Sequence, residues 1–272
     1  MSNVISYTNK ADSLIQAIKK FWKFRGLIWI FTKRDLKVKY AQTSLGLIWT
    51  FFKPLLGLFI YAGFFGFILK WKTGDLPFVI YVLSGLLAWN LFVQTTTTGA
   101  LAAIESKDVI RKIYFPKSIL IFAKTTLATI DFCAGLFLFI PLILIYEISF
   151  SWNLVFAPFI LLYNILIGLS LAFIFALISV RKRDFLQLLP FLLNMGIWLS
   201  PVFYTIEILP KKLHFFMELN PLNSLVELWR WTLFDIGEIQ IIWLIHPLLT
   251  VALFILSFWL FSKIENKFVD EG

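Results

Sequence analysis

The chain has 272 residues, of which 60% are hydrophobic and 15% are charged, whereas soluble domains average about 45–50% apolar and about 25% charged residues. This apolar surplus excludes an ordinary water-soluble domain and indicates a protein of the lipid bilayer. The net charge of +9 does not indicate a nucleic-acid partner, because the basic residues cluster between apolar runs, where they would meet anionic lipid headgroups. Cys133 is the only cysteine in the sequence, which excludes an internal disulfide and a cysteine-rich metal site.

The first predicted element is an amphipathic helix over residues 13–31. Apolar side chains recur at helical spacing and basic side chains gather on the other side, with Phe21 and Trp22 in the apolar set and Lys19 and Lys23 in the basic set. A basic amphipathic helix is suited to the headgroup plane of a membrane. The alternative is a helix whose apolar face packs on another protein.

Six apolar runs follow, and each is long enough to cross about 30 Å of hydrocarbon as an α-helix. They span residues 45–69, 77–103, 119–146, 154–180, 185–204 and 239–262. Helices are favoured over barrel strands because the runs are continuous and because lipid cannot satisfy open backbone groups. Lys53 and Pro54 interrupt the first run, and the third contains Lys124 and Asp131. We expect Asp131 to pair with Lys124 or with a neighbouring helix.

Residues 206–238, between the fifth and sixth runs, carry too many charges for a crossing. The charged residues are Glu207, Lys211, Lys212, Glu218, Glu227, Arg230, Asp235 and Glu238. Each would be costly in the bilayer interior. Pro210 and Pro221 divide the segment, so we expect a pair of short re-entrant or interfacial helices over residues 206–235.

The distribution of basic residues predicts the orientation of the chain. Most Lys and Arg residues lie in the N-terminal region, in the loop after the second run, at residues 181–183 and after the last run. Short loops rich in Lys and Arg stay on the cytoplasmic side. We therefore expect a multi-pass membrane protein with both termini in the cytoplasm, and an even number of spans also places both termini on the same side.

The sequence contains no motif for nucleotide or zinc chemistry. It has no G-x-x-x-x-G-K-[ST] loop and no H-E-x-x-H pair, so we expect no cofactor on this chain. The two histidines, His214 and His246, lie far apart in sequence, which favours packing or interfacial roles. The spans also lack the ladder of acidic residues that a proton-coupled pump would need.

The loop over residues 103–112 is a candidate contact for a partner subunit. It is short and helix-compatible, and its charged residues are Glu105, Lys107, Asp108, Arg111 and Lys112. A plain solvated loop has the same composition. The partner interpretation is suggested by a chain that has transporter-like spans but no ATP site.

Aromatic residues of the first and fifth runs form a second candidate group. They are Trp49, Phe52, Phe59, Trp198, Phe203 and Tyr204. Aromatic faces stack on sugar rings and still let them slide, because single dispersion contacts are weak. Lipid-facing aromatic belts and helix packing produce the same pattern, so both interpretations stay open.

Several short blocks follow one another along nearly the whole chain. They are Arg34–Tyr40 with Ser44-Leu45-Gly46, Trp49 and Pro54; Ser84-Gly85-Leu86 with Trp89; Ile110–Pro116; Arg183-Asp184 with Leu199-Ser200-Pro201-Val202; and Asn220-Pro221-Leu222 with Glu227 and Arg230. In this order the blocks resemble the ABC-2 type permeases that export polysaccharides. The chain is accordingly interpreted as a single ABC-2 type transmembrane domain over residues 1–272.

The resemblance implies a homodimer that binds two copies of a separate ATPase, with ATP and magnesium held by that partner. Such permeases carry lipid-linked O-antigen, capsular polysaccharide or teichoic acid across the inner membrane. In that picture residues 13–31 form an interface helix, the loop Glu105–Lys112 couples to the ATPase, and residues 206–235 lie near the channel exit. The first and fifth spans would line the channel, which favours sugar stacking by Trp49, Phe52, Trp198 and Tyr204.

The sequence thus predicts a conduit rather than a catalyst. One alternative is an ABC-2 exporter of a lipid or drug. The other is a membrane-embedded glycosyl- or acyltransferase, for which Asp184 beside Arg183 is the only polar indication. An enzyme would need a convergent set of acid, base and nucleophile.

Overall fold

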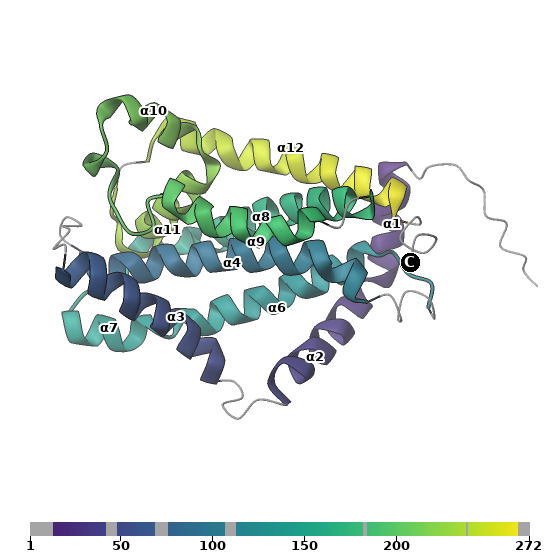
Figure 1. Cartoon of the computed structure of the whole chain (residues 1–272), viewed down its shortest axis with the longest axis horizontal. Helices are drawn as coiled ribbons and strands as arrows, with labels where there is room; N and C mark the ends of the chain where they lie inside the picture. Colours follow the sequence, from purple (N-terminus) through teal and green to yellow (C-terminus); the bar gives the residue numbers. More distant parts are fainter. Residues whose placement is uncertain are drawn as a thin grey trace, which may run out of the picture.

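A computed structural model describes residues 13–41, 48–68, 76–106, 113–181, 184–237 and 239–265. Within these ranges every regular element is a helix, which confirms the predicted all-α class. Figure 1 shows the long helices running along one axis, with α1 (Leu14–Phe24) lying across one end of them. The short helices α10 (Lys211–Leu219) and α11 (Pro221–Phe234) lie toward the opposite end.

The N-terminal helix is shorter than predicted. Its start is a capping box, in which the side chains of Ser13 and Gln16 each accept a hydrogen bond from the backbone N–H of the other. The helix ends at Phe24, and a second helix, α2 (Gly26–Ala41), follows after one turn residue. Glycine is a poor helix former, and the break beside Gly26 makes two helices where one was expected over residues 13–31.

Five of the six predicted runs form helical segments long and apolar enough to cross a membrane. They are α3 with the π-helix η1 (Ile48–Tyr61 and Ala62–Ile68), α4 (Phe78–Glu105), α6 with α7 (Ser118–Leu136 and Phe139–Tyr146), η2 with α8 (Trp152–Phe156 and Ala157–Arg181), and α12 (Ile241–Ile264). Large apolar side chains such as Leu248 of α12 are exposed. Lipid is the medium in which such side chains are stable, so the chain is a multi-pass membrane protein.

The fifth predicted run forms a shorter helix than expected. Helix α9 (Asp184–Gly196) continues into a 3₁₀ turn, η3 (Ile197–Leu199), and residues 200–204 are not helical. Ser200 has φ −128° and ψ 143°, the extended conformation favoured by a residue that precedes proline. At about 1.5 Å per residue, residues 184–199 span roughly 24 Å, less than the roughly 30 Å of a bilayer core.

Helix α4 is the centre of the bundle and packs against α3, α6, α8, α9 and α11. Its most extensive packing is with α8. A Cβ added at Gly168 of α8 would lie 2.8 Å from the Thr95 side chain, and one at Gly99 of α4 would lie 2.9 Å from Cβ of Ala172. Small residues at these positions let the two backbones approach, as is common between membrane helices.

The segment over residues 206–235 forms short helices separated at the prolines. A 3₁₀ turn, η4 (Ile206–Ile208), precedes α10, which begins directly after Pro210, and α11 begins at Pro221. The Asn220 side chain caps α11 by accepting a hydrogen bond from the Leu222 N–H at 3.0 Å. Helix α11 is buried along most of its length. The two prolines thus divide the segment as expected, whereas a re-entrant path for these helices stays a prediction.

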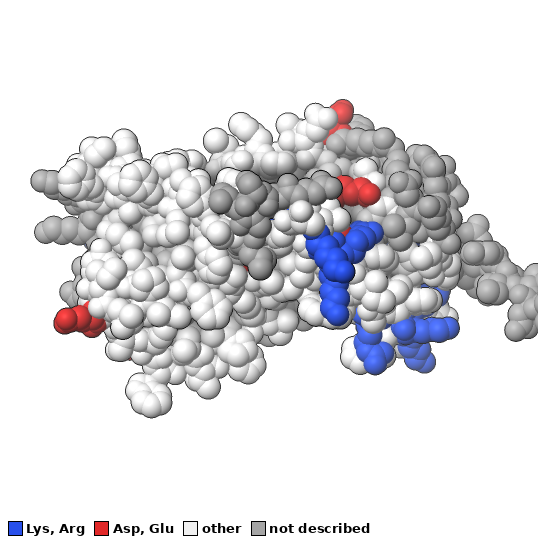
Figure 2. Space-filling view, turned by 90° about the horizontal axis from the view of Figure 1, so that it is seen from below, with Lys and Arg blue, Asp and Glu red and all other residues white. Residues whose placement is uncertain are grey.

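Figure 2 shows one long face of the molecule, on which uncharged residues cover most of the surface. The blue side chains gather toward the end that carries the N-terminal helices. Helix α2, one of these N-terminal helices, contains Lys33, Arg34, Lys37 and Lys39. The uncharged area is suited to contact with lipid, and the basic area is suited to anionic headgroups or to an acidic partner.

Candidate functional site

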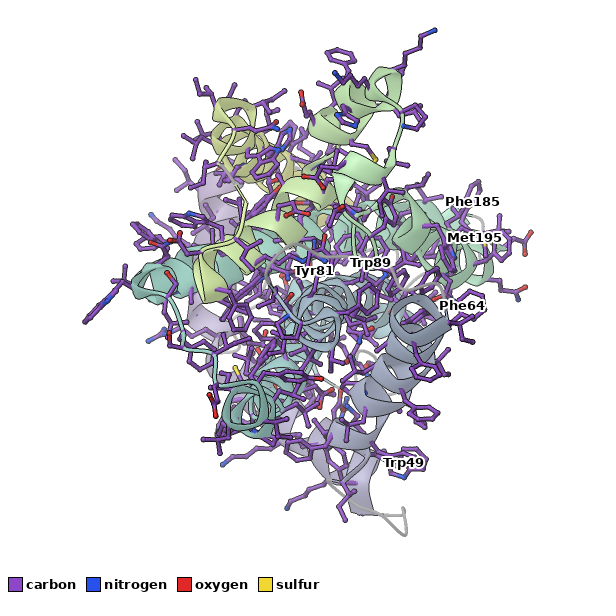
Figure 3. All side chains as sticks on the ribbon, turned by 90° about the vertical axis from the view of Figure 1, so that its left-hand side faces the viewer. Trp49, Phe64, Tyr81, Trp89, Phe185 and Met195 are labelled. Carbon is purple, nitrogen blue, oxygen red and sulfur yellow. The ribbon has the colours of Figure 1, made fainter. Side chains whose placement is uncertain are left out.

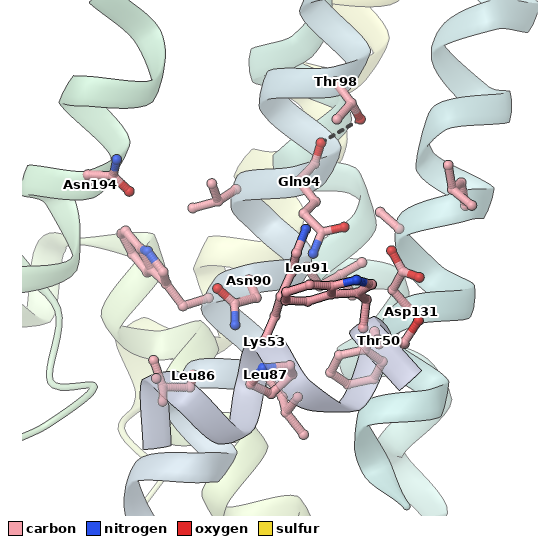
Figure 4. A pocket seen from close by; sticks show the side chains of 18 of the residues that line it. Thr50, Lys53, Leu86, Leu87, Asn90, Leu91, Gln94, Thr98, Asp131 and Asn194 are labelled. Carbon is pink, nitrogen blue, oxygen red and sulfur yellow. Dashed lines mark hydrogen bonds between the residues drawn. The ribbon is translucent and has the colours of Figure 1, made fainter. Parts of the chain in front are cut away.

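A cavity of about 840 Å³ lies between α3, α4, α6 and α9, with the C-terminal part of α2 at its edge. Figure 4 shows its wall, where Asn90 and Gln94 project from α4, Asp131 from α6 and Asn194 from α9. The lining combines charged, amide, aromatic and aliphatic side chains. Polar groups within spans of this kind mark pathways for a substrate.

Ion pairs tie α2 to α6 on one side of the cavity. Lys39 pairs with Asp131, and the Tyr40 hydroxyl donates to the second carboxylate oxygen of Asp131 at 2.8 Å. Tyr40 also lies 2.5 Å from the Thr50 hydroxyl of α3. The partner of Asp131 is therefore on a neighbouring helix, one of the two partners expected from the sequence.

Lys124, the other expected partner of Asp131, forms ion pairs with different residues. Its amino group lies 3.1 Å from Asp35 of α2 and 3.1 Å from Glu105 at the end of α4. The ammonium therefore joins three helices, α2, α4 and α6. Because opposite charges face each other in a partly buried place, these contacts favour one relative position of the three helices.

Three tryptophans line the same cavity: Trp49 of α3, Trp89 of α4 and Trp198 of η3. Figure 3 places Trp89 inside the bundle and Trp49 at its periphery on α3. Trp49 and Trp198 belong to the predicted aromatic group. Trp89 was noted only as part of a sequence block, because hydropathy does not show the rotation of a helix about its own axis.

The other predicted aromatics lie outside this lining. Phe52 and Phe59 border a second, apolar hollow on the outer side of α3, and Phe59 is 79% exposed. Phe203 is fully buried and stacks on Tyr61 with ring centroids 3.9 Å apart. The Tyr204 hydroxyl donates to the Trp198 carbonyl at 2.9 Å, so Tyr204 supports a residue that lines the cavity.

A buried arginine lies on α11, which packs against α4. Arg230 of α11 has no exposed surface. Its guanidinium donates to Glu227 and to the Tyr81 hydroxyl, each at 2.8 Å, and to the Val202 carbonyl at 3.0 Å. A Cβ added at Gly85 would lie 2.9 Å from this guanidinium. Three blocks that are far apart in sequence therefore meet at one side chain.

The predicted interface helix packs by one face only. Phe21 contacts Phe122 of α6 and Phe258 of α12, with ring centroids 4.6 Å and 6.1 Å apart. Trp22, Lys19 and Lys23 are exposed. The helix is thus anchored to two spans and leaves a basic, aromatic face uncovered.

The predicted coupling loop is described only at its first charged residue. Glu105 is half-exposed and pairs with Lys124, whereas Lys107, Asp108, Arg111 and Lys112 lie outside the described residues. Near the same end of the bundle, Glu265 accepts a hydrogen bond from the Lys117 N–H at 2.7 Å. Burial raises the pKa of Glu265 to about 7.

Other predicted site residues have structural partners. Asn220 caps α11, and Pro221 offers its carbonyl to the Tyr163 hydroxyl at 2.7 Å. Asp184 is exposed at the start of α9. His246 contacts the Ser224 hydroxyl at 2.8 Å. No group of three or more His, Cys, Asp or Glu side chains in the described part of the chain has the arrangement of a metal site.

Comparison with known families assigns the architecture. Residues 26–234 match the model of the family described as "ABC-2 type transporter". The chain belongs to the ABC-2 type transporter family. The matched region contains the whole cavity lining and the Arg230 cluster of this ABC-2 type chain.

Curated relatives of this ABC-2 type chain are polysaccharide transport proteins by name. An O-antigen export system permease protein of Myxococcus xanthus is 27% identical over 219 residues, which cover 78% of this chain and 82% of that protein. A protein of the same name from Klebsiella pneumoniae is 24% identical over 90% of this chain and 94% of its own length. A polysialic acid transport protein of Escherichia coli is 26% identical over 72% of this chain and 77% of its own length.

Proposed function

We propose that this chain is the permease subunit of an exporter that moves lipid-linked polysaccharide across the bacterial inner membrane. The observation that carries the proposal is the ABC-2 type architecture joined to relatives named for O-antigen export and polysialic acid transport. The cavity supports it, because tryptophan faces and free amide groups are suited to sugar rings and hydroxyls. The candidate polymers are O-antigen, capsular polysaccharide and teichoic acid.

In this proposal ATP is hydrolysed by a separate subunit. Two copies of the chain form a homodimer and bind two copies of an ATPase, which holds ATP and magnesium. The sequence has no P-loop motif, which supports a division of labour. The exposed face of α1 and the loop Glu105–Lys112 are the proposed contacts, since both segments carry basic residues.

We further propose how the chain lies in the membrane. Both termini are cytoplasmic, the five long helical segments cross the bilayer, and α9 is the sixth span. The pair α10 and α11 is re-entrant from the opposite side. The excess of Lys and Arg in the terminal segments supports this orientation. Residues 200–204, which follow this helical segment, are buried within the protein.

Deleting the gene in its own host tests the proposed function directly. We expect polymer to accumulate inside the cell and to disappear from the surface, and expression of the wild-type chain to restore surface polymer. Immunoblotting of surface and cytoplasmic fractions distinguishes the two pools. Unchanged surface polysaccharide together with altered lipid or drug efflux would contradict the proposal and favour a lipid or drug exporter.

A further inference from the structure

Lys53 is a cation within the first membrane helix. It lies in α3 on a strongly apolar stretch and lines the cavity together with α4, α6 and α9. Figure 4 shows its side chain extending from α3 into the cavity. A lysine in a span is unfavourable unless it faces water or an opposite charge, so such residues commonly mark a binding site or a pathway.

The other charges of the cavity wall are neutralised by one another. Lys39 pairs with Asp131, and Lys124 pairs with Asp35. Within the described part of the chain, no ion pair or hydrogen bond involves the Lys53 ammonium. Among the described residues of this wall, the Lys53 ammonium is therefore a positive charge without a counter-ion.

Amide side chains surround the same space. Asn90 and Gln94 of α4 and Asn194 of α9 line the cavity. Among the described residues, none of these side-chain amides makes a hydrogen bond. Each amide offers two N–H donors, and the Lys53 ammonium offers three. Donors gathered around a cation form a site for an anionic oxygen group, because bonds from a charged donor to an anion are the strong ones.

We propose that Lys53, with the amides of Asn90 and Gln94, binds an anionic group of the cargo in this cavity. The group is a phosphate, such as one that links a carrier lipid to its glycan, or the carboxylate of an acidic sugar. The inference rests on the proposed function, since it requires cargo in the cavity. A volume of about 840 Å³ leaves room for a sugar beside the anion, and the tryptophan wall is suited to that sugar.

Binding to the purified full-length chain in lipid nanodiscs tests this inference. The probes are farnesyl diphosphate, farnesol as its uncharged counterpart, oligogalacturonate, and a neutral dextran oligosaccharide, each titrated calorimetrically. We expect a charged probe to bind more tightly than its neutral counterpart. Lys53→Gln should weaken that binding about tenfold, since losing one charge-assisted bond of about 1.4 kcal/mol corresponds to a factor of ten.

Two further variants separate charge from folding. Lys53→Arg keeps the cation and should retain most of the affinity. Lys212→Gln removes an exposed lysine of α10 that is not part of the lining, and it should leave the affinity unchanged. Loss of binding in Lys53→Gln but not in these two variants would support a site in which the positive charge of Lys53 binds the anion.

The two anion sources give different results. Lys53-dependent binding of farnesyl diphosphate assigns the site to the phosphate of a carrier lipid, and Lys53-dependent binding of oligogalacturonate assigns it to an acidic sugar. Equal affinity of the wild-type and Lys53→Gln chains for both anions would overturn the inference. If the wild-type gene still restored polymer export in the deletion strain, that result would leave the proposed function in place.

Discussion

The Arg230 cluster offers a sharp test of the fold, because one side chain joins three segments. Replacing Arg230 with methionine keeps much of its apolar volume but removes the partner of Glu227, whose side chain is only 10% exposed. Removing one member of a buried ion pair costs about 3–5 kcal/mol, since the remaining charge is left uncompensated. We expect Arg230→Met to lower the free energy of unfolding by that amount.

The double variant Arg230→Met, Glu227→Leu should be more stable than Arg230→Met alone. It leaves no charge in this cluster, and the Tyr81 hydroxyl still donates to the Tyr204 carbonyl, so the Val202 carbonyl is the group that loses its arginine donor. An unsatisfied buried polar group costs about 1–3 kcal/mol. The free energy of unfolding of the double variant is therefore expected to be roughly 1–3 kcal/mol lower than that of the wild type but higher than that of Arg230→Met.

The measurement is unfolding of the purified chain in detergent, followed by intrinsic fluorescence while a denaturing detergent is added. Lys211→Met, on the exposed helix α10, is the control and should leave the stability unchanged. If Arg230→Met unfolds at the same concentration of denaturing detergent as the wild type, the reasoning is wrong. A double variant that is no more stable than Arg230→Met alone would refute the ion-pair argument in particular.

Three further predictions concern other parts of the chain. Gly168→Leu forces a side chain against Thr95 and should cost about 1–3 kcal/mol of stability by overpacking, measured by the same unfolding assay; an unchanged midpoint would contradict the close α4–α8 contact. Replacing both Lys107 and Arg111 with glutamate should leave ATP hydrolysis by the assembled transporter intact and abolish polymer export, whereas normal export would argue against the coupling role. Burial raises the pKa of Glu265 to about 7 from 4.5, so the folded chain retains a proton that the unfolded chain releases, and stability falls as pH rises between these values. Melting temperatures at pH 5 and pH 8 should therefore differ more for the wild type than for Glu265→Gln, and equal differences would contradict this assignment.

Much of the helical framework was predictable because lipid restricts the backbone to few solutions. Long apolar runs must be helices there, and five of the six expected runs meet the length and hydropathy of a span. The prolines at 210 and 221 marked the starts of α10 and α11, since proline interrupts a helix interior but suits its first turn. For Asp131 the sequence predicted two possible ion partners and could not decide between them. A charge within a span requires a counter-charge but does not specify which residue supplies it.

The end of α9 was predicted incorrectly because apolar composition reports burial and not backbone conformation. Val202 and Phe203 are fully buried, but they lie beyond Ser200, whose extended backbone interrupts the helix. The aromatic residues show the same limit. Phe59 and Phe203 belonged to one predicted group, although one is 79% exposed and the other is buried. Which side chains face the cavity depends on how each helix is rotated about its axis, and only tertiary packing decides that rotation.

Crosslinking at the cavity wall tests the central claim most directly. A photoreactive amino acid at Trp198, which lines the cavity, is compared with one at Phe59 on the outer side of α3. After illumination of cells that are exporting polymer, antibodies against the polysaccharide detect any glycan joined to the chain. We expect a glycan-bearing product at Trp198 and none at Phe59. A product at Phe59 with none at Trp198 would contradict passage of the polymer through this cavity.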